Sequence, residues 1–261
     1  DLAIVVVGEN PLRYQKSKTC GENIDRMGLD LLGTQNQLVQ KIHETGVPTI
    51  VVLVGGRPLS VNWIAQNVQA LVQAWEPGSL GGRALANILA GKVNPSAKLP
   101  ISIPRHSGQI QMIYNHKPSQ YFHKYIDGPS TPLYPFGFGL SYTRFAYSSL
   151  KLSHTRISDK DSFTASIELT NVGDREGTEV VQLYIRDIYS SATRPVKELK
   201  DFARVTLKPG EKKTVTFTVT PDKLAYWNRN MQYGVEKGEF EIMIGSSSQD
   251  KDLKKVKMEV L

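Results

Sequence analysis

The hydrophobic pattern of this chain changes its period near the middle, and this change limits the available folds more than any other feature. Up to about residue 104, continuous apolar runs such as 2–7 and 49–54 alternate with segments of helical spacing such as 34–45. Continuous apolar runs are typical of strands covered on both faces, and their alternation with helices indicates a mostly parallel sheet. Residues 1–104 are therefore predicted to form an α/β domain with right-handed crossovers.

The rest of the chain divides into two segments that differ in composition and hydrophobic pattern. Residues 105–145 are rich in proline and aromatic residues, which is typical either of a functional loop or of a linker packed between domains. From residue 146 onward, apolar and polar residues alternate in short runs separated by turn signals such as Lys208-Pro-Gly210. These runs lie at 163–169, 181–185, 215–219 and 240–244. Short runs of period two predict an antiparallel β-sandwich over 146–261.

Composition and charge exclude several function classes. The 261 residues carry a net charge of +7, but the basic residues are scattered, whereas a nucleic-acid-binding protein shows a basic patch or a known module. No apolar stretch approaches the ~18 residues of a membrane span. The single cysteine, Cys20, excludes a disulfide framework and a Cys-rich zinc site. The five histidines lack paired helical spacing and no nucleotide-binding motif occurs, so we expect neither metal nor cofactor.

One long connection remains as a candidate site. It follows the first apolar run, extends to Leu31, and carries four carboxylates, at Glu9, Glu22, Asp25 and Asp30. Ligands of open α/β sheets bind outside the carboxyl ends of the strands. Gly21 permits a tight backbone beside Glu22, and Arg26 is placed to orient a neighbouring carboxylate. From these residues alone, the carboxylates are either a site or solvated loop charges.

Several sequence motifs occur in this chain in an order that is similar to that of a known protein family. They include Gly-Glu-Asn-Ile-Asp-Arg-Met-Gly-Leu-Asp-Leu at 21–31 and the stretches 52–59, 74–100, 133–145, 171–173, 176–184, 194–199 and 207–210. In this order they resemble the C-terminal part of glycoside hydrolase family 3, the family of β-glucosidases and β-xylosidases. The resemblance covers nearly the whole chain. Leu32 and Ala97 depart from it, because the family usually has proline and glycine there.

The resemblance implies a domain organisation. Residues 1–104 would form an α/β sandwich domain without its first strands, 105–145 a loop and linker, and 146–261 a fibronectin type III-like domain. The family's catalytic barrel, which carries the nucleophilic Asp, is absent here and would be supplied in cis or as a second chain. Members of the family are typically periplasmic or secreted, and we expect the same compartment.

The resemblance also implies roles for individual residues. Glu22 matches the family's acid/base, which needs a raised pKa from partial burial and a neighbouring anion; Glu9 is the second candidate for that role. Asp25 and Arg26 are expected to support the loop. Tyr121 and Phe122 are weaker candidates for contacts with outer sugar subsites, with interdomain packing as the alternative.

The function implied is that of a retaining β-glycosidase acting on terminal non-reducing sugars of β-linked oligosaccharides or aryl glycosides. Because the nucleophile would lie in the barrel, the chain alone is expected to be inactive. A catalytically inactive structural or carbohydrate-binding module is the alternative. A nucleotide-binding α/β protein is a third interpretation, which would require saturable nucleotide binding.

Overall fold

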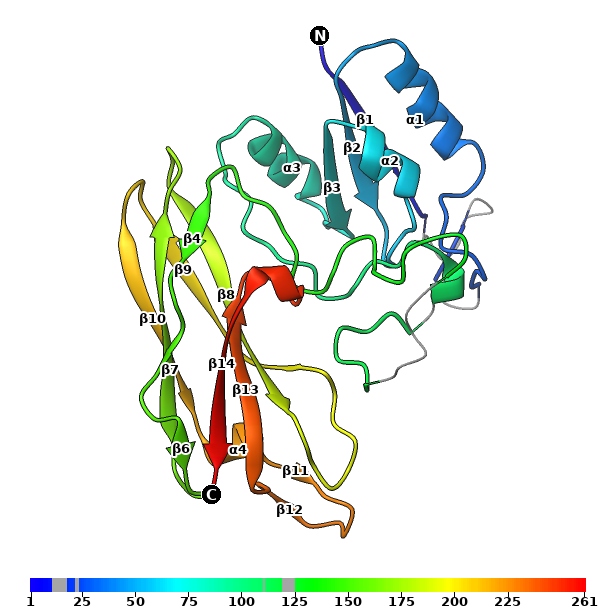
Figure 1. The fold of residues 1–261 in the computed structure, drawn as a ribbon. Helices are drawn as coiled ribbons and strands as arrows, with labels where there is room; N and C mark the ends of the chain where they lie inside the picture. Colours follow the sequence, from blue (N-terminus) through cyan, green and yellow to red (C-terminus); the bar gives the residue numbers. More distant parts are fainter. Residues whose placement is uncertain (11–17, 22–23, 110, 119–124) are drawn as a thin grey trace. The chain divides into compact units, whose positions relative to one another are not determined.

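The computed structural model describes residues 1–10, 18–21, 24–109, 111–118 and 125–261 (Figure 1). Their contacts divide the chain into two compact units. The first comprises Asp1–Val93, Ser102–Met112 and Thr131–Tyr134. The second comprises Asn94–Ile101, Ile113–Ser130 and Pro135–Leu261.

The first unit is built on a parallel sheet. Its strands are β1 (Ala3–Gly8), β2 (Thr49–Val54) and β3 (Ala70–Trp75), in the order β1-β2-β3. The connecting helices are α1 (Gln35–Glu44) and α2 (Asn62–Asn67), followed by α3 (Gly81–Leu89) and the short 3₁₀ helix η1 (Ser107–Gln109). The predicted parallel α/β region is confirmed.

The core of this unit lies on one face of the sheet. Val39 of α1 and Ile64 of α2 are completely buried there, together with Val51 of β2. Along β1 the exposure alternates: Val5 and Val7 belong to this core, whereas their neighbours on the other face do not. The helices α1 and α2 pack against each other and α1 packs against β1 and β2.

The prediction that the first apolar run is covered on both faces is wrong for the described residues. Ile4 is 50% exposed and Val6 61% exposed. The reason is that the buried core of the unit lies on the side of Val5 and Val7, so Ile4 and Val6 lie on the opposite face of the strand. An apolar run therefore does not by itself show that both faces of a strand are packed.

The second unit is a β-sandwich with two main sheets. One has the order β6 (Arg156–Ile157), β14 (Leu253–Val260), β13 (Gly238–Gly245), β8 (Gly177–Asp187) and β9 (Glu198–Leu207). The other has β10 (Lys212–Val219), β7 (Phe163–Asn171) and β4 (Phe145–Tyr147), with β5 (Lys151–Leu152) also on β7. Neighbouring strands are antiparallel except β14 and β6. The predicted antiparallel sandwich is confirmed.

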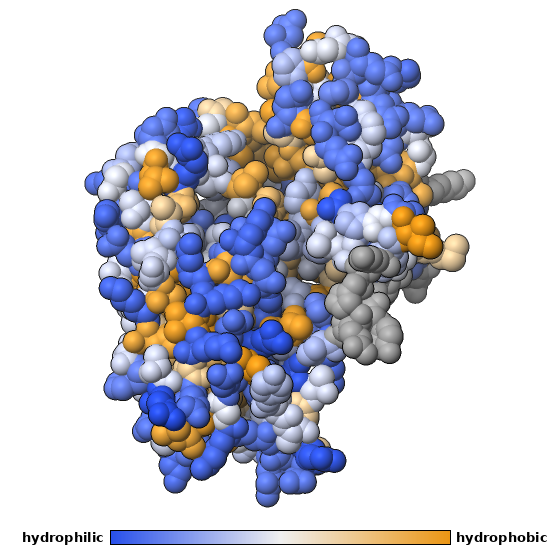
Figure 2. All heavy atoms as spheres, in the orientation of Figure 1, coloured by the Kyte–Doolittle hydropathy of each residue, from blue (hydrophilic) through white to orange (hydrophobic). Residues whose placement is uncertain are grey.

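Alternating side chains fill the space between these sheets. On β7, Phe163, Ala165, Ile167 and Leu169 all point into one buried cluster. On the face drawn in Figure 2, hydrophilic and hydrophobic residues are interspersed. The unit is completed by helix α4 (Pro221–Leu224), the ribbon β11 (Tyr226–Trp227) and β12 (Tyr233–Gly234), and the 3₁₀ helix η2 (Asp250–Asp252).

Residues 94–101 are fastened to the sandwich by polar bonds. The side-chain oxygen of Asn94 accepts hydrogen bonds from the Ser141 hydroxyl (2.9 Å) and the Tyr142 amide (2.8 Å), and its amide nitrogen donates to the carbonyl of Glu176 (3.0 Å). Lys98 forms an ion pair with Glu179 at 2.8 Å, and both side chains are largely buried. This segment thus belongs to the second unit by its contacts.

A carboxylate at the end of β8 gives the sandwich an expected pH dependence. Burial raises the pKa of Asp187 to about 6, with Glu236 and Glu198 adding to the shift and Arg194 opposing it. Its Oδ2 has no hydrogen-bond partner among the described residues. The folded state therefore holds this proton more tightly than the unfolded chain, in which the pKa of the carboxyl is about 3.8. The free energy of unfolding should fall as the pH rises from 3.8 to about 6, because the folded state binds more protons than the unfolded chain in this range.

The variant Asp187→Asn tests this expectation. It should raise the melting temperature of the sandwich at pH 7.5, where the wild-type carboxylate is charged, and change it little near pH 4, where the carboxyl is already protonated in the folded state. Thermal unfolding followed by circular dichroism at both pH values measures the difference. Asp159→Asn, at an exposed position, is the matched control. An equal gain at both pH values would contradict the expectation.

Candidate active site

Charged side chains gather at the carboxyl ends of β1 and β2. Glu9 follows β1 directly, and Arg57 lies three residues beyond the end of β2. Parallel strands present their carboxyl ends at the same edge of the sheet, where ligands of α/β proteins bind. The two residues belong to the first unit, and so does Arg26 from the long connection after β1.

Glu9 is the centre of this group. Its side chain is only 1% exposed. One carboxylate oxygen lies 2.5 Å from a terminal guanidinium nitrogen of Arg26, and the other lies 3.1 Å from Nε of Arg57. A buried carboxylate requires such pairing, because its desolvation is otherwise very costly. Glu9 therefore ties the connection after β1 to the residues that follow β2.

The backbone beside Glu9 is held closely. Gly8 has a φ of +149°, and a β-carbon at this position would lie 1.8 Å from the carbonyl oxygen of Val54, so only glycine fits. The side-chain amide of Gln35, at the start of α1, accepts from the Gly8 amide (2.7 Å) and donates to the Gly8 carbonyl (3.0 Å). The direction in which the chain leaves β1 is thereby fixed.

The two arginines also hold the connection itself. Arg26 donates to the carbonyl oxygen of Asp30, and its amide donates to the Asp25 carboxylate at 2.8 Å. Arg57 donates to the same carboxylate at 2.7 Å. The amide of Arg26 and then the Arg57 guanidinium hold the pKa of the exposed Asp25 below its usual range. Asp25 is therefore an anion whose role is to fasten Arg57 and the backbone.

Cys20 lies against this group and is 4% exposed. Burial, and then the charge of Glu9, raise the pKa of its thiol, which hydrogen-bonds to Glu9. The thiolate is the reactive form of cysteine. Cys20 is thus a packed, protonated thiol and not a nucleophile.

The sequence-predicted site residues divide into two sets. The structure brings Glu9, Asp25 and Arg26 together. Glu22, Tyr121 and Phe122 lie outside the described residues. On either side of Glu22, the Ile24 amide donates to the Gly21 carbonyl at 3.0 Å.

Sequence reasoning did not single out Arg57 as a site residue. The signal was present, because Gly55-Gly56-Arg57 directly follows an apolar strand and lies inside one of the motifs. What the sequence does not show is that its partner is Glu9, 48 positions earlier in the chain by residue number.

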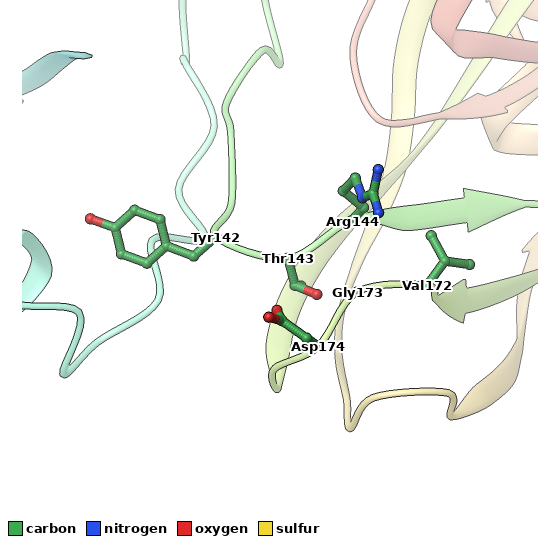
Figure 3. A pocket seen from close by; sticks show the side chains of 6 residues that line it. All are labelled: Tyr142, Thr143, Arg144, Val172, Gly173 and Asp174. Carbon is green, nitrogen blue, oxygen red and sulfur yellow. The ribbon is translucent and has the colours of Figure 1, made fainter. Parts of the chain in front are cut away.

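The second unit has an open hollow of about 430 Å³ lined by Tyr142, Thr143, Arg144, Val172, Gly173 and Asp174 (Figure 3). Asp174 is its single carboxylate, and the ring of Tyr142 points away from the other labelled residues. Paired carboxyl groups are what glycoside hydrolysis requires. The group around Glu9 is therefore the stronger candidate for chemistry.

The described residues contain no group of three or more His, Cys, Asp or Glu side chains that could hold a metal ion. None of their helices is long and apolar enough to cross a membrane.

Two family models match the sequence. Residues 1–142 match the glycosyl hydrolase family 3 C-terminal domain, and residues 179–248 match a fibronectin type III-like domain.

Relatives match along nearly the whole chain. A β-xylosidase from Formosa agariphila is 46% identical over 100% of this chain, which covers 36% of that protein. A periplasmic β-glucosidase from Salmonella typhimurium is 41% identical over 95% of this chain, which covers 33% of it. The chain thus spans about a third of the length of these relatives.

A solved relative shows the same fold. The β-glucosidase from Listeria innocua in complex with glucose is 34% identical over 100% of this chain, with a TM-score of 0.91, and the chain covers 36% of it. A mutant of that enzyme has been solved in complex with laminaribiose. Because the family model covers more than half of its residues, the chain belongs to glycosyl hydrolase family 3, of which it carries the C-terminal domain followed by a fibronectin type III-like domain.

Proposed function

We propose that this chain is part of a retaining β-glycosidase of the β-glucosidase or β-xylosidase type. Its substrates are terminal non-reducing sugars of β-linked oligosaccharides and aryl glycosides. The chain supplies the acid/base, Glu22, and a barrel domain, in cis or as a second chain, supplies the nucleophilic Asp. The observation that carries the proposal is the ionic group around Glu9, which fastens both Arg26 and Asp25 shortly after Glu22.

The reaction needs two carboxyl groups about 5–5.5 Å apart. The Asp carboxylate attacks the anomeric carbon while Glu22 gives its proton to the glycosidic oxygen, and the leaving group departs as an alcohol. Glu22, now a carboxylate, then takes a proton from water. The hydroxide formed attacks the anomeric carbon, and the bond from the sugar to Asp breaks. These steps move only protons and the glycosyl group, so the proposal includes no metal and no cofactor.

The burial of Glu9 argues against this residue as the acid/base. A group in this role must reach the glycosidic oxygen and must exist in both protonation states during one cycle. The Glu9 side chain is 1% exposed and each of its oxygens lies against a guanidinium group, so it is enclosed by ion pairs and not open to a sugar. We therefore give Glu9, together with Asp25 and Arg26, a supporting role.

Two further parts of the proposal rest on the sequence. Tyr121 and Phe122 remain predicted contacts for outer sugar subsites, since aromatic rings stack on the C–H faces of sugars. The compartment proposed is the periplasm or the exterior of the cell, which agrees with the name of the Salmonella typhimurium relative.

The proposal is tested by comparing this chain alone with the same chain joined to its barrel. Aryl β-glucosides and β-xylosides should be hydrolysed by the joined protein and not by the 261-residue chain, because the nucleophile is missing from the latter. Intact mass of each sample identifies any barrel-sized polypeptide that copurifies. Turnover by the repurified chain alone would overturn the division of roles, and inactivity of the joined protein on both substrates would favour a structural or carbohydrate-binding module.

A further inference from the structure

The ribbon of β11 and β12 exposes two aromatic side chains at one end of the sandwich (Figure 1). Trp227 is 61% exposed and Tyr233 is 56% exposed. The two residues lie directly opposite each other in the antiparallel register, so their side chains share one face of the ribbon. Their ring centroids are 5.4 Å apart and the ring planes are tilted by 53°. Single exposed apolar residues are ordinary on protein surfaces, whereas two adjacent large rings are a candidate ligand surface.

Hydrogen bonds on the other face of the ribbon hold these rings in place. Tyr226 points to that face, as neighbours along a strand do; it is 4% exposed and its hydroxyl donates to Glu236. The Glu236 carboxylate also accepts from the amide (2.9 Å) and the hydroxyl (2.6 Å) of Ser191, in the connection after β8. At the turn, the side-chain oxygen of Asn228 accepts from the Gln232 amide (3.0 Å). A surface fixed in this way loses little conformational freedom when a ligand binds.

The chemistry of the hairpin limits what the aromatic pair can bind. Residues 226–234 contain one charged side chain, Arg229, so a nucleic acid, which needs a basic patch, does not fit. The two exposed rings offer on the order of 250 Å², whereas a stable protein interface needs about 800 Å² from each partner. A pyranose ring is neutral, has C–H groups on its faces and hydroxyl groups at its edge, and matches an aromatic ring in size. The pair therefore suits a chain of neutral sugars.

We propose that the face formed by Trp227 and Tyr233 is a binding surface for single β-linked glucan chains, with one sugar stacked on each ring. The distance between the ring centroids is about the spacing of neighbouring sugars in such a chain. The tilt between the rings suits a chain that twists from one sugar to the next, whereas the flat surface of crystalline cellulose requires coplanar rings. The choice of a β-linked glucan rests on the proposed function, because the enzyme would hold here the class of polymer whose ends it hydrolyses.

Affinity electrophoresis of the 261-residue chain tests the proposal, run towards the cathode because the net charge is +7. Hydroxyethyl cellulose or laminarin, two soluble β-linked glucans, should retard the wild-type chain. Trp227→Ala and Tyr233→Ala should each weaken binding at least ~10-fold, the usual scale for truncating an aromatic hot spot. Tyr233→Phe keeps the ring and should bind as the wild type does. Because these side chains are exposed, the melting temperatures of the variants should stay close to that of the wild type.

Phe202→Ala is the matched control, because it removes an aromatic ring that is 57% exposed on β9. It should be retarded as strongly as the wild type. The inference is overturned if neither glucan retards the wild type, if Phe202→Ala loses as much affinity as Trp227→Ala, or if the chain binds only microcrystalline cellulose. It is also overturned if the chain binds neither glucan but forms dimers in analytical ultracentrifugation that Trp227→Ala abolishes, which would assign the surface to a second copy.

Failure of this inference is distinguishable from failure of the proposed function, because binding by the chain alone requires no turnover. In the protein joined to its barrel, Trp227→Ala should leave kcat/KM for a small aryl β-glucoside unchanged. If the joined protein hydrolyses no β-glycoside while the chain binds glucan through Trp227, the proposed function is wrong and the binding surface stands. If hydrolysis occurs and Trp227→Ala binds both glucans as the wild type does, only the binding surface is wrong.

Discussion

Glu22→Gln in the enzyme that contains this chain and its barrel should lower kcat/KM for an alkyl β-glucoside or β-xyloside roughly 10²–10⁴-fold, the usual contribution of a general acid. Glutamine keeps the size of glutamate but has no proton to transfer to the glycosidic oxygen. Steady-state kinetics on an alkyl glycoside measures the loss directly. The nucleophile is untouched by this change, so the loss belongs to the acid/base alone.

The leaving group provides an internal check on the role. An aryl glycoside with a strongly activated phenol departs without a proton, so Glu22→Gln should impair its first step much less than that of an alkyl glycoside. The second step still lacks its base, and the glycosyl-enzyme should accumulate as a burst of phenol. Added azide, which attacks without base assistance, should restore turnover and yield a β-glycosyl azide. A uniform loss on all substrates, with no burst and no rescue, would contradict the assignment.

Glu44→Gln is the matched control, since it makes the same substitution at a position on α1 where the side chain is 58% exposed. It should retain wild-type kinetics on both substrates. Wild-type activity of Glu22→Gln on alkyl glycosides would remove Glu22 from the mechanism altogether.

The spacing of apolar residues along the sequence predicts most of the fold, because it follows which face of each helix or strand is buried. The segment 34–45 was expected to be helical and contains α1. The alternating run at 163–169 lies in β7, and its four apolar side chains point into one core. In both cases one face is buried and the other is not, so the pattern along the chain reflects the packing.

In the strands β9 and β1, the apolar pattern does not predict which side chains are exposed. In β9 only Val205 and Leu207 are buried, and Phe202 is 57% exposed. Among the described residues the strand pairs with β8 alone, and its buried and exposed side chains do not alternate strictly along its length. In β1 an unbroken apolar run does not predict that Ile4 and Val6 are exposed, because the core lies on the side of Val5 and Val7.

The candidate site was predictable in its residue types but not in its pairing. A loop with several carboxylates after the first strand pointed to the carboxyl edge of the sheet. Nothing in the sequence pairs Glu9 with Arg57, because that contact follows from the parallel register in which Gly8 lies beside Val54. The register brings together residues that the chain itself keeps far apart.

Asn171→Asp should be the most destabilising conservative substitution in the sandwich. Asn171 is completely buried at the end of β7. Its side-chain oxygen accepts from the Thr143 hydroxyl (2.7 Å) and the Gly173 amide (3.1 Å). Its side-chain nitrogen donates to the carbonyls of Arg175 (2.8 Å) and Leu207 (2.9 Å). The amide thus satisfies four groups, and two of them need a donor that a carboxylate lacks.

The expected loss is about 3–5 kcal/mol in the free energy of unfolding, because a buried charge would face two carbonyl oxygens. Urea unfolding followed by circular dichroism, with the two units fitted separately, measures it. The loss should shrink as pH falls towards 4, since protonation of the new carboxyl removes the buried charge and supplies one donor. Thr143→Val, which removes one of the four bonds, should cost only about 1 kcal/mol.

Asn230→Asp is the matched control for this prediction, because Asn230 is exposed in the turn between β11 and β12. The same chemical change there should alter the free energy of unfolding by less than about 0.5 kcal/mol. If Asn171→Asp were as stable as Asn230→Asp at neutral pH, the four hydrogen bonds of Asn171 would not hold the end of β7 against the residues before β8 and at the end of β9. A loss confined to Asn171 and relieved by acid would show that its two donated bonds fix that corner of the sandwich.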